Sequence, residues 1–480
     1  MDANVYRCLH CDDHPLGHQP EALTCGKCGA SYPILLGVPL LLKDVRIVRR
    51  HSPLSPELIG TICEQMRLPL DGATAQRLQE IFSYEYELPE LHLAAENNYF
   101  FNRIAAPAPL LRAPPAADAL PVNERIHYEI VDHLIPDTLP HGRVLTRNVR
   151  LRNRGPSVIS SRGRSPVRLT YRWRTLTGDI LADEGEPTVL PIDLLPGRTI
   201  SLPTMIRTPR RTASYLLELC LVRGDGTWLH EDAGSVGVEV ILPGDVPATP
   251  PHWVHLEKPQ DTYNYQEDHN VARDLVFEEI ARRRKPGYRI LEVGGCCNPM
   301  TRGADAEIYS IDIDVQTLQV GQLSITDPAE RLRFVAADVN DPPFPDRFFD
   351  CIALFSALHH LPRPVEVLAR LKRLLKKDGF LAIMCEPVGA YLHGQVSQEF
   401  IRDLEQGINE QIFTAEEYHH MFQRAGLFAS TVVTDRGSFK SILEVQVPSA
   451  RTLPPDPEPA PLTLLPRIRR RLGRLCSRSA

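Results

Sequence analysis

The C-terminal half of the chain repeats one pattern of hydrophobic and polar positions. Short apolar runs alternate with stretches of helical periodicity. The runs occupy residues 289–293, 307–312, 334–339, 350–355 and 380–385. A short apolar run bounded by turn residues is typical of a strand buried on both faces of a parallel sheet. We therefore predict an α/β domain over residues 263–447, with helices between parallel strands.

The preceding region, residues 119–245, has a hydrophobic period of two. Residues 143–151 and 167–173 alternate apolar and polar side chains. Turn sequences such as Gly155-Pro156 and Pro196-Gly197 separate the runs. Short alternating strands at this spacing predict an antiparallel β-sandwich with one solvated face.

Two C-x-x-C pairs mark residues 1–45 as a small zinc ribbon. Their members are Cys8, Cys11, Cys25 and Cys28. Each pair presents two thiolates on one tight turn, and two pairs complete a tetrahedron around Zn²⁺. Four cysteines leave no open coordination position, so we expect a structural site. The next apolar stretch, residues 32–42, predicts a strand, a turn and a second strand.

The remaining segments join these units. Residues 50–118 show helical periodicity, with Ser55 as a cap, and their aromatic stretch 96–103 could line an acceptor pocket or pack against the ribbon. Residues 246–262 are proline-rich, as in a linker, and residues 448–480 form a proline-rich and basic tail, solvated or in contact with an anionic membrane. The predicted fold class is multidomain α/β plus β: ribbon, helical segment, antiparallel sandwich and C-terminal α/β domain.

Composition narrows the class of protein. The 480 residues carry a formal net charge of -6 and are 43% hydrophobic. We therefore expect a soluble protein and no nucleic-acid partner. No stretch reaches the ~20 apolar residues of a spanning helix, and the start of the chain lacks the pattern of a signal peptide. Four of the 11 cysteines are clustered, which favours a reducing compartment, and we expect the cytoplasm.

Three acids close successive runs of the α/β domain. Glu292 ends the first run, Asp312 the second and Asp338 the third. A Gly294-Gly295 turn follows Glu292. Ligands of open α/β sheets bind outside the carboxyl ends of the strands. The pattern predicts a nucleoside-binding site formed by these acids and the glycine turn.

These residues, with Leu358-His359-His360-Leu361 and Lys376-Lys377-Asp378-Gly379, resemble a class I S-adenosylmethionine-dependent methyltransferase of the ubiquinone/menaquinone-type branch. The resemblance covers roughly residues 265–446 and implies a Rossmann-like domain. It implies that Glu292, Gly294 and Gly295 border the methionine end of S-adenosylmethionine. It further implies that Asp312 accepts the ribose hydroxyls and that Asp338 binds the adenine amine, with Val339 beside the ring.

One departure concerns the glycine loop. The family usually has glycine at every second position, whereas this chain has Gly294, Cys296 and Asn298. A Cβ at residue 296 could weaken cofactor binding, or Gly295 could supply the turn instead. A nicotinamide-dependent reductase is the alternative dinucleotide enzyme, but the loop lacks G-x-G-x-x-G, and that class has no matching role for Asp338 or the His pair.

Methyl transfer to a hydroxyl needs a group that removes the acceptor's proton. His359 and His360 follow the fourth run and are the candidate bases, with a structural role as the alternative. Glu386, after the fifth run, is the second candidate.

The accessory regions suggest the acceptor. Residues 1–45 resemble the Trm112-like zinc ribbon that activates methyltransferases. Residues 119–245 resemble the immunoglobulin-like sandwiches attached to bacterial glycosyltransferases, and Trp173 and Trp228 could stack on a sugar, although a lone tryptophan more often lies in a core. We expect O-methylation of a sugar or related small molecule in glycan or surface-polysaccharide biosynthesis, with a glycosyltransferase as a possible partner. The alternative is a catalytically silent scaffold with a degenerate cofactor loop.

Overall fold

The structure of the chain is a computed structural model, and its compact unit spans Met1–Val445. It describes residues 5–11, 14–49, 54–88, 126–162, 166–242, 253–256, 265–389, 398–406, 408–435 and 438–445. The predicted tail and the aromatic stretch 96–103 lie outside the described residues. Among the residues described, no helix has the length and apolar character needed to cross a membrane.

The five apolar runs of the α/β domain form neighbouring parallel strands. In spatial order β19-β18-β17-β20-β21, their bounds are β19 (Leu332–Ala337), β18 (Glu307–Asp312), β17 (Arg289–Val293), β20 (Phe349–Phe355) and β21 (Leu375–Pro387). The fifth strand begins earlier than predicted. Residues 375–379 already belong to β21, which starts directly after the preceding helix ends at Leu374. Two antiparallel strands extend this side of the sheet: β22 (Phe428–Asp435) and β23 (Ser438–Glu444).

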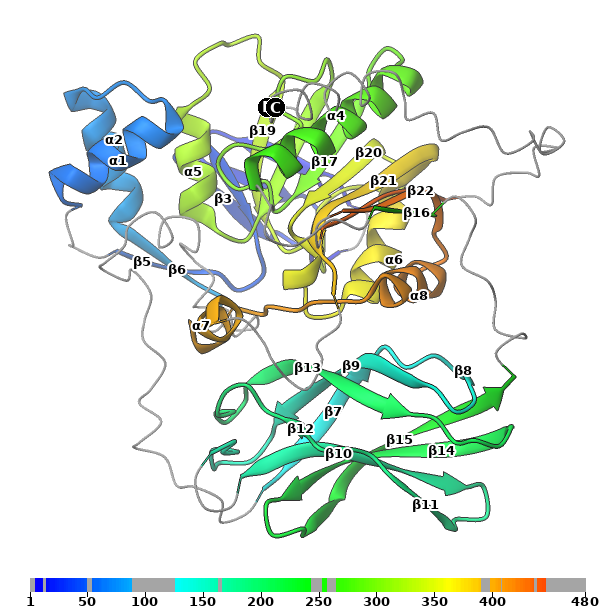
Figure 1. Cartoon of the computed structure of the whole chain (residues 1–480). Helices are drawn as coiled ribbons and strands as arrows, with labels where there is room; N and C mark the ends of the chain where they lie inside the picture. Colours follow the sequence, from blue (N-terminus) through cyan, green and yellow to red (C-terminus); the bar gives the residue numbers. More distant parts are fainter. Residues whose placement is uncertain are drawn as a thin grey trace, which may run out of the picture. The chain divides into compact units, whose positions relative to one another are not determined.

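Helices cover both faces of these strands (Figure 1). On one face, α4 (Tyr265–Arg283) and α5 (Val315–Leu323) share a core with Ile290, Ile308 and Ala353. On the other, α6 (Pro364–Leu374) and α8 (Ala415–Arg424) share a core with Leu291 and Val293. Successive residues of one strand therefore enter different cores, which explains the continuous apolar runs in the sequence.

The ribbon extends the same sheet. Its strands are β1 (Leu16–Gln19), β2 (Ala22–Cys25), β3 (Ser31–Leu35) and β4 (Val38–Leu41). β4 pairs in parallel with β19, where Leu40 lies opposite Ala336 and Leu41 opposite Ala337. The strand-turn-strand prediction for residues 32–42 is confirmed by β3 and β4. The result is one sheet of 12 strands that runs from β1 to β16 (Trp253–Leu256).

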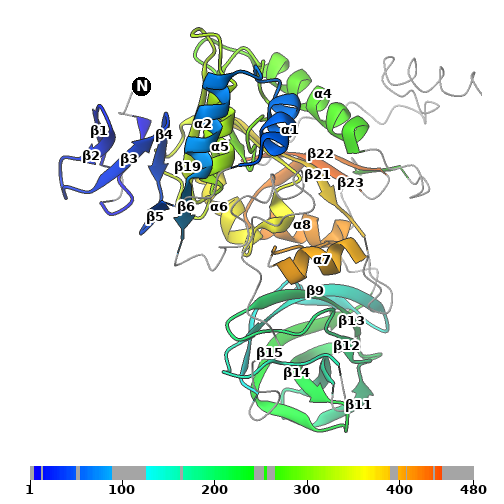
Figure 2. The same cartoon turned by 90° about the vertical axis from the view of Figure 1, so that its left-hand side faces the viewer.

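The predicted helical segment contains two helices and an unpredicted strand. The helices are α1 (Pro56–Met66), capped by Ser55, and α2 (Gly72–Phe82). β6 (Tyr84–Glu87) then pairs with β5 (Arg46–Arg49). Figure 2 shows α2 beside α5. Two buried glutamines of α5 bind the strand that follows α2: Gln316 donates to the Tyr84 carbonyl of β6 (2.6 Å), and Gln319 donates to the hydroxyl of Tyr86 (2.9 Å).

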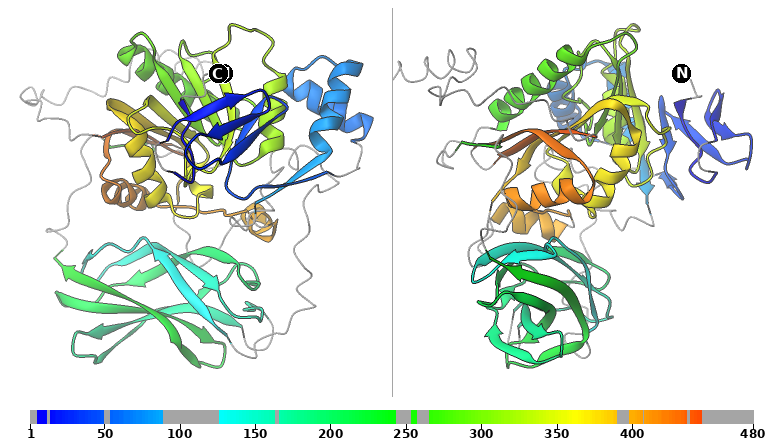
Figure 3. Two further views of the ribbon diagram at one scale, coloured as in Figure 1. Left: turned by 180° about the vertical axis from the view of Figure 1, so that it is seen from behind. Right: turned by 90° about the vertical axis from the view of Figure 1, so that its right-hand side faces the viewer.

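Residues 126–242 form a β unit of two sheets, seen in Figure 3. The three-stranded sheet contains β13 (Thr199–Arg207), β9 (Val144–Asn153) and β7 (Tyr128–His133). The six-stranded sheet contains β11 (Ile180–Glu184), β10 (Val167–Thr175), β14 (Ala213–Arg223), β15 (Trp228–Ile241), β8 (Thr138–Pro140) and β12 (Thr188–Val189). Leu151 and Ile200 of the first sheet share a core with Leu169 and Leu217 of the second.

Of the two alternatives for Trp173, a core residue or a sugar-stacking ring, the structure confirms the core. Trp173 is fully buried and donates its indole N–H to the Arg207 carbonyl (2.9 Å), so it cannot stack on a sugar. The half-buried Trp228 has the guanidinium of Arg172 over its ring, 5.1 Å from the ring centroid. The segment 246–262 is also more than a linker, because β16 within it pairs in parallel with β22.

Candidate active site

The three acids predicted to bind a nucleoside follow adjacent strands. β19, β18 and β17 are neighbours and parallel, so their carboxyl ends lie at one edge of the sheet. Asp338 follows β19, Asp312 ends β18, and Glu292 lies next to the end of β17. The topology therefore brings these three positions to the same edge, as the sequence predicts.

The Glu292 carboxylate accepts hydrogen bonds from the loop that follows β17. The residue is 1% exposed, and its carboxylate accepts from the N–H of Met300 (2.7 Å) and from the N–H and hydroxyl of Thr301 (2.8 and 2.7 Å). Burial raises the pKa of Glu292, and the hydrogen bonds from Thr301 and Met300 oppose that rise. Glu292 thus closes the loop 294–301, which is a positioning role beside the predicted methionine site.

The loop requires glycine at its first two positions. Gly294 has φ of 72°, and a Cβ at Gly295 would lie 2.7 Å from the Ser310 hydroxyl. Cys296 also adopts a left-handed conformation, with φ of 48°. For a residue with a Cβ this conformation costs roughly 1–2 kcal/mol. The loop therefore keeps two left-handed bends, one at Gly294 and a strained one at Cys296.

Asp312 and Asp338 are each held through one carboxylate oxygen. The N–H of Asp314 donates to Asp312 Oδ1 (3.0 Å), and the N–H and side-chain amide of Asn340 donate to Asp338 Oδ1 (2.8 and 3.0 Å). Burial raises the pKa of Asp312, and nearby N–H groups of Asp314 and Cys296 oppose the rise. A carboxylate has about four acceptor sites, so each of these acids can accept a further hydrogen bond from a ligand.

Glu386 anchors the turn that carries the His pair, η5 (Leu358–His360), a 3-10 turn. The Glu386 side chain is fully buried and accepts from the N–H groups of Ala357, Leu358 and His359 at 2.9–3.0 Å. It also accepts from His359 Nδ1 at 2.7 Å. These bonds orient the imidazole of His359 and place Glu386 behind it, in a positioning role.

The Glu410 carboxylate lies beside the imidazoles of His359 and His360. It lies 3.7 Å from His359 Nε2 and 3.3 Å from His360 Nδ1, and the two imidazole centroids are 4.0 Å apart. The side-chain amide of Gln411 donates to the carbonyls of His359 (2.9 Å) and Leu361 (3.0 Å). The sequence analysis missed Glu410 and Gln411, which lie in a stretch without a motif.

A second missed group lies at the end of β20. His269 of α4 has Nδ1 2.9 Å from the Tyr265 carbonyl oxygen and Nε2 3.1 Å from the Ser356 hydroxyl. Ser356 has φ of 50°. Burial lowers the pKa of His269, which favours its neutral form. No motif in the sequence marks this group.

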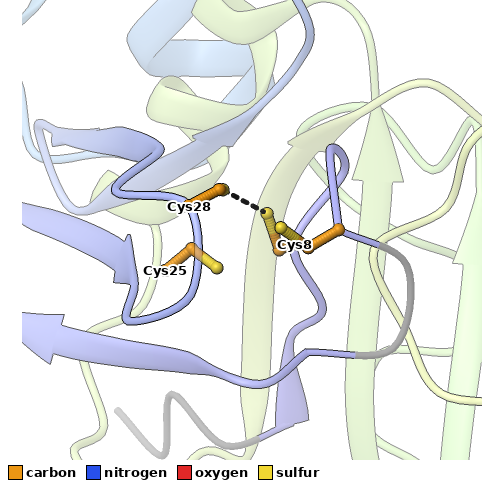
Figure 4. A group of neighbouring side chains, drawn as sticks. Cys8, Cys25 and Cys28 are labelled. Atoms are coloured by element: carbon orange, nitrogen blue, oxygen red, sulfur yellow. Dashed lines mark hydrogen bonds between the residues drawn. The ribbon is translucent and has the colours of Figure 1, made fainter.

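The four ribbon cysteines converge as predicted. Their Sγ atoms lie within 4.8 Å of one another, and Figure 4 shows Cys8, Cys25 and Cys28 around a common point. Cys8 Sγ and Cys28 Sγ are 3.6 Å apart, close to the edge of about 3.8 Å that Zn–S bonds of ~2.3 Å give in a tetrahedron. The four thiols therefore fit a Zn²⁺ ion.

Comparison with known proteins gives a family for the central part of this region. Residues 291–383 match the family described as "Methyltransferase domain". The chain carries a class I methyltransferase domain. The matched residues include the glycine loop, Asp312, Asp338 and the His pair; Glu386 and the ribbon cysteines lie outside them.

Curated relatives support the same family over part of their length. A ubiquinone/menaquinone biosynthesis C-methyltransferase of Stutzerimonas stutzeri is 32% identical over 124 residues, which cover 24% of this chain and 48% of the relative. The corresponding protein of Bordetella avium is 28% identical over 21% of this chain and 41% of its own. The chain thus spans about half the length of the curated relatives it matches. Among solved structures, YcgJ of Bacillus subtilis is 20% identical, with a TM-score of 0.29 over 34% of this chain and 70% of YcgJ.

Proposed function

We propose that the methyltransferase domain transfers a methyl group from S-adenosylmethionine to a hydroxyl of a small-molecule acceptor. The observation that carries the proposal is the pair of carboxylates Asp312 and Asp338 beside the Gly294-Gly295 turn. They follow adjacent strands, and the bonds from Asp314 and Asn340 both go to Oδ1 of the respective carboxylate. A ribose diol and an exocyclic amine are donors, for which carboxylates are matching acceptors.

The residues would divide the cofactor between them. Asp312 would accept from the ribose hydroxyls and Asp338 from the adenine amine, with the buried Val339 beside the ring. Gly294 and Gly295 would let the main chain approach the methionine end, while Glu292 holds the loop closed. When bound, S-adenosylmethionine supplies an activated sulfonium methyl, so the protein mainly positions the acceptor and handles its proton.

The acceptor's proton would be removed at the His pair. His359 and His360 lie at the end of β20, and Glu386 fixes the imidazole of His359 from behind. Glu386 has its carboxylate directed at four protein donors. Its part in the reaction is therefore to position His359, not to contact the acceptor.

The acceptor class and the partner are extensions of this proposal. The likeness of residues 119–245 to modules of glycan-pathway enzymes supports a sugar or related small molecule as the acceptor. The same likeness supports a glycosyltransferase as the partner. The curated relatives are named for C-methylation in ubiquinone and menaquinone biosynthesis, so an acceptor of that kind is the competing outcome.

The ribbon would hold one structural Zn²⁺ through Cys8, Cys11, Cys25 and Cys28. The hydroxyl of Tyr32 supports the site, since it accepts from the N–H of Leu9 (2.9 Å) and lies 3.5 Å from Cys8 Sγ. Retention of four thiols suits a reducing compartment, and we place the protein in the cytoplasm.

Calorimetry with S-adenosylmethionine tests the proposal directly. We expect a heat of binding, followed by transfer of a labelled methyl group to an acceptor in cell extract, with the product identified by mass spectrometry. Absence of any binding heat with folded protein would contradict the enzyme and favour the scaffold. The strained Cys296 in the cofactor loop is the feature that makes this outcome worth testing.

A further inference from the structure

The imidazoles of His359 and His360 both face the Glu410 carboxylate, at separations longer than a charged hydrogen bond usually has. The same imidazole of His359 has Nδ1 2.7 Å from Glu386 and Nε2 3.7 Å from Glu410. Charged N–H···O bonds are about 2.7–2.9 Å long. The first contact has that length, whereas the second, and the 3.3 Å from His360 Nδ1 to Glu410, are longer.

The longer separations lie near the edges of a cation's coordination shell. Bonds of about 2.0–2.2 Å from a divalent ion to imidazole nitrogen and carboxylate oxygen give tetrahedral edges of roughly 3.3–3.6 Å. A ligand atom from each of His359, His360 and Glu410 lies within 4.8 Å of the other two. We infer that these three residues bind a divalent first-row cation such as Zn²⁺.

The surroundings of the three residues are those of a metal site. Glu386 accepts the Nδ1 proton of His359, which fixes the tautomer with its lone pair on Nε2, toward Glu410. A carboxylate behind a ligating imidazole is the usual outer partner of bound zinc. The main chain is also fixed, because the side-chain amides of Asn409 and Gln411 donate to the carbonyls of His360 and His359.

A second cluster shows the contrast. A ligand atom from each of Asp268, His269 and Cys385 also lies within 4.8 Å of the others. There, however, the Asp268 carboxylate forms a salt bridge with the ammonium group of Lys440 and accepts from the hydroxyl of Ser438 (2.7 Å). A protein cation already serves that carboxylate, so a metal ion there would compete with Lys440.

The site would be catalytic in kind. Three protein ligands leave a coordination position for water or substrate, and the side chains of His360 and Glu410 are 23% and 14% exposed. This role rests on the proposed methyl transfer, although binding of the cation does not. With the cation bound, the imidazole nitrogens are ligands and not bases, and an acceptor hydroxyl at the open position would instead lose its proton to solvent water. Its oxygen would then form the O–CH₃ bond while the S–CH₃ bond breaks and its electron pair stays on sulfur.

Metal content of the full-length protein tests the inference. The protein is purified without chelator and dialysed against micromolar Zn²⁺, and zinc per chain is measured by mass spectrometry. We expect two equivalents in the wild type, one from the ribbon and one from this site. Glu410→Gln and His360→Asn should each retain one equivalent. The matched control, Glu405→Gln on the exposed side of α7 (Gln398–Gln406), should retain two.

Replacement of Zn²⁺ by Co²⁺ locates the ions. The ribbon thiolates give near-ultraviolet charge-transfer absorption, which Glu410→Gln should leave intact while the remaining visible absorption falls. One equivalent in the wild type, or unchanged zinc in both Glu410→Gln and His360→Asn, would overturn the inference. Calorimetry with S-adenosylmethionine on the same samples reports separately on the proposed function, since cofactor binding and metal content can fail independently.

Discussion

The two halves of the ligand-binding edge are supported by different parts of the chain. On the nucleoside half, α5 follows Asp312 and is enclosed by the N-terminal segment: β4 continues the sheet beside β19, and α1 and α2 share a core with Val320 of α5. On the acceptor half, the segment with Glu410 and Gln411 contacts the β unit instead. Asn148 of β9 donates through its side chain to the Ile412 carbonyl (2.9 Å), and its N–H donates to the Glu417 carboxylate (2.6 Å).

The kind of contact differs as well as the partner. Backbone pairing and an apolar core support the nucleoside half, whereas on the acceptor half the buried polar bonds of Asn148 accompany an apolar core shared with Phe400 and Leu404 of α7. A shared sheet edge tolerates many side-chain changes, because its bonds come from the main chain. A buried polar contact depends on each partner, because loss of one leaves the other unsatisfied. The nucleoside half should therefore depend on the integrity of the ribbon, and the acceptor half on single residues.

Removal of the ribose acid should have the largest effect. Asp312→Ala deletes the acceptor of two hydroxyl donors, and charged hydrogen bonds contribute about 1.5–3 kcal/mol each. We expect S-adenosylmethionine affinity to fall at least roughly a hundredfold by calorimetry, with an unchanged circular dichroism spectrum. The control is Asp346→Ala, an acid whose side chain is 53% exposed. Equal affinity in the two variants would remove Asp312 from the site.

Loss of the ribbon's metal should come next. Cys25→Ser with Cys28→Ser removes two of the four thiols and should release zinc, because half of the ligand set is gone. Since the ribbon carries β4, we expect a lower melting temperature and about tenfold weaker S-adenosylmethionine binding. His18→Gln, at an exposed position of the same ribbon, serves as the control. Full cofactor affinity in zinc-free, folded protein would show that the nucleoside half stands without the ribbon.

A substitution on the acceptor half should lower the stability of the protein but leave its affinity for S-adenosylmethionine unchanged. Asn148→Ala removes the donor to Ile412 and two side-chain contacts of Glu417 at 3.1 and 3.2 Å. We expect the free energy of unfolding to fall by about 1–3 kcal/mol, with cofactor affinity within twofold of wild type. Arg152→Ala, on the same strand, is the matched control. A large loss of cofactor affinity in Asn148→Ala would contradict the division into two halves.

The smallest effect concerns pH. Burial raises the pKa of Asp312, and only the ionised carboxylate accepts both ribose hydroxyls. As pH falls through that raised pKa, the carboxylate gains a proton and affinity should decrease, by less than tenfold per pH unit for one proton. Calorimetry between pH 5 and 8 measures the slope. Glu292 also has a raised pKa and could contribute to the pH dependence of affinity. The variant Asp312→Asn lacks the titrating carboxyl of residue 312, so any pH dependence that remains in it comes from another group.

The sequence predicted the parts that depend on local pattern. The five parallel strands follow from continuous apolar runs, and the places of Asp312 and Asp338 follow from strand ends. Pairing of β4 with β19 could not be predicted, because Leu40 and Ala336 are far apart in the chain and neither run specifies its neighbour. Glu410 was missed for a related reason, since only tertiary packing brings it to the His pair. The alternating pattern of residues 167–173 did not tell whether Trp173 lies on the surface or in the core, and in the structure it is buried in the core.

The pairing of β4 with β19 has a consequence during synthesis. The ribosome releases β4 early, while its parallel partner β19 is made only after the β unit and the first two strands of the methyltransferase domain. Until then the edge of β4 exposes unpaired N–H and carbonyl groups, which can pair with other chains. Contacts between such distant segments also form slowly. The nascent N-terminal ribbon is therefore the part of this protein that we expect chaperones to bind first and release last.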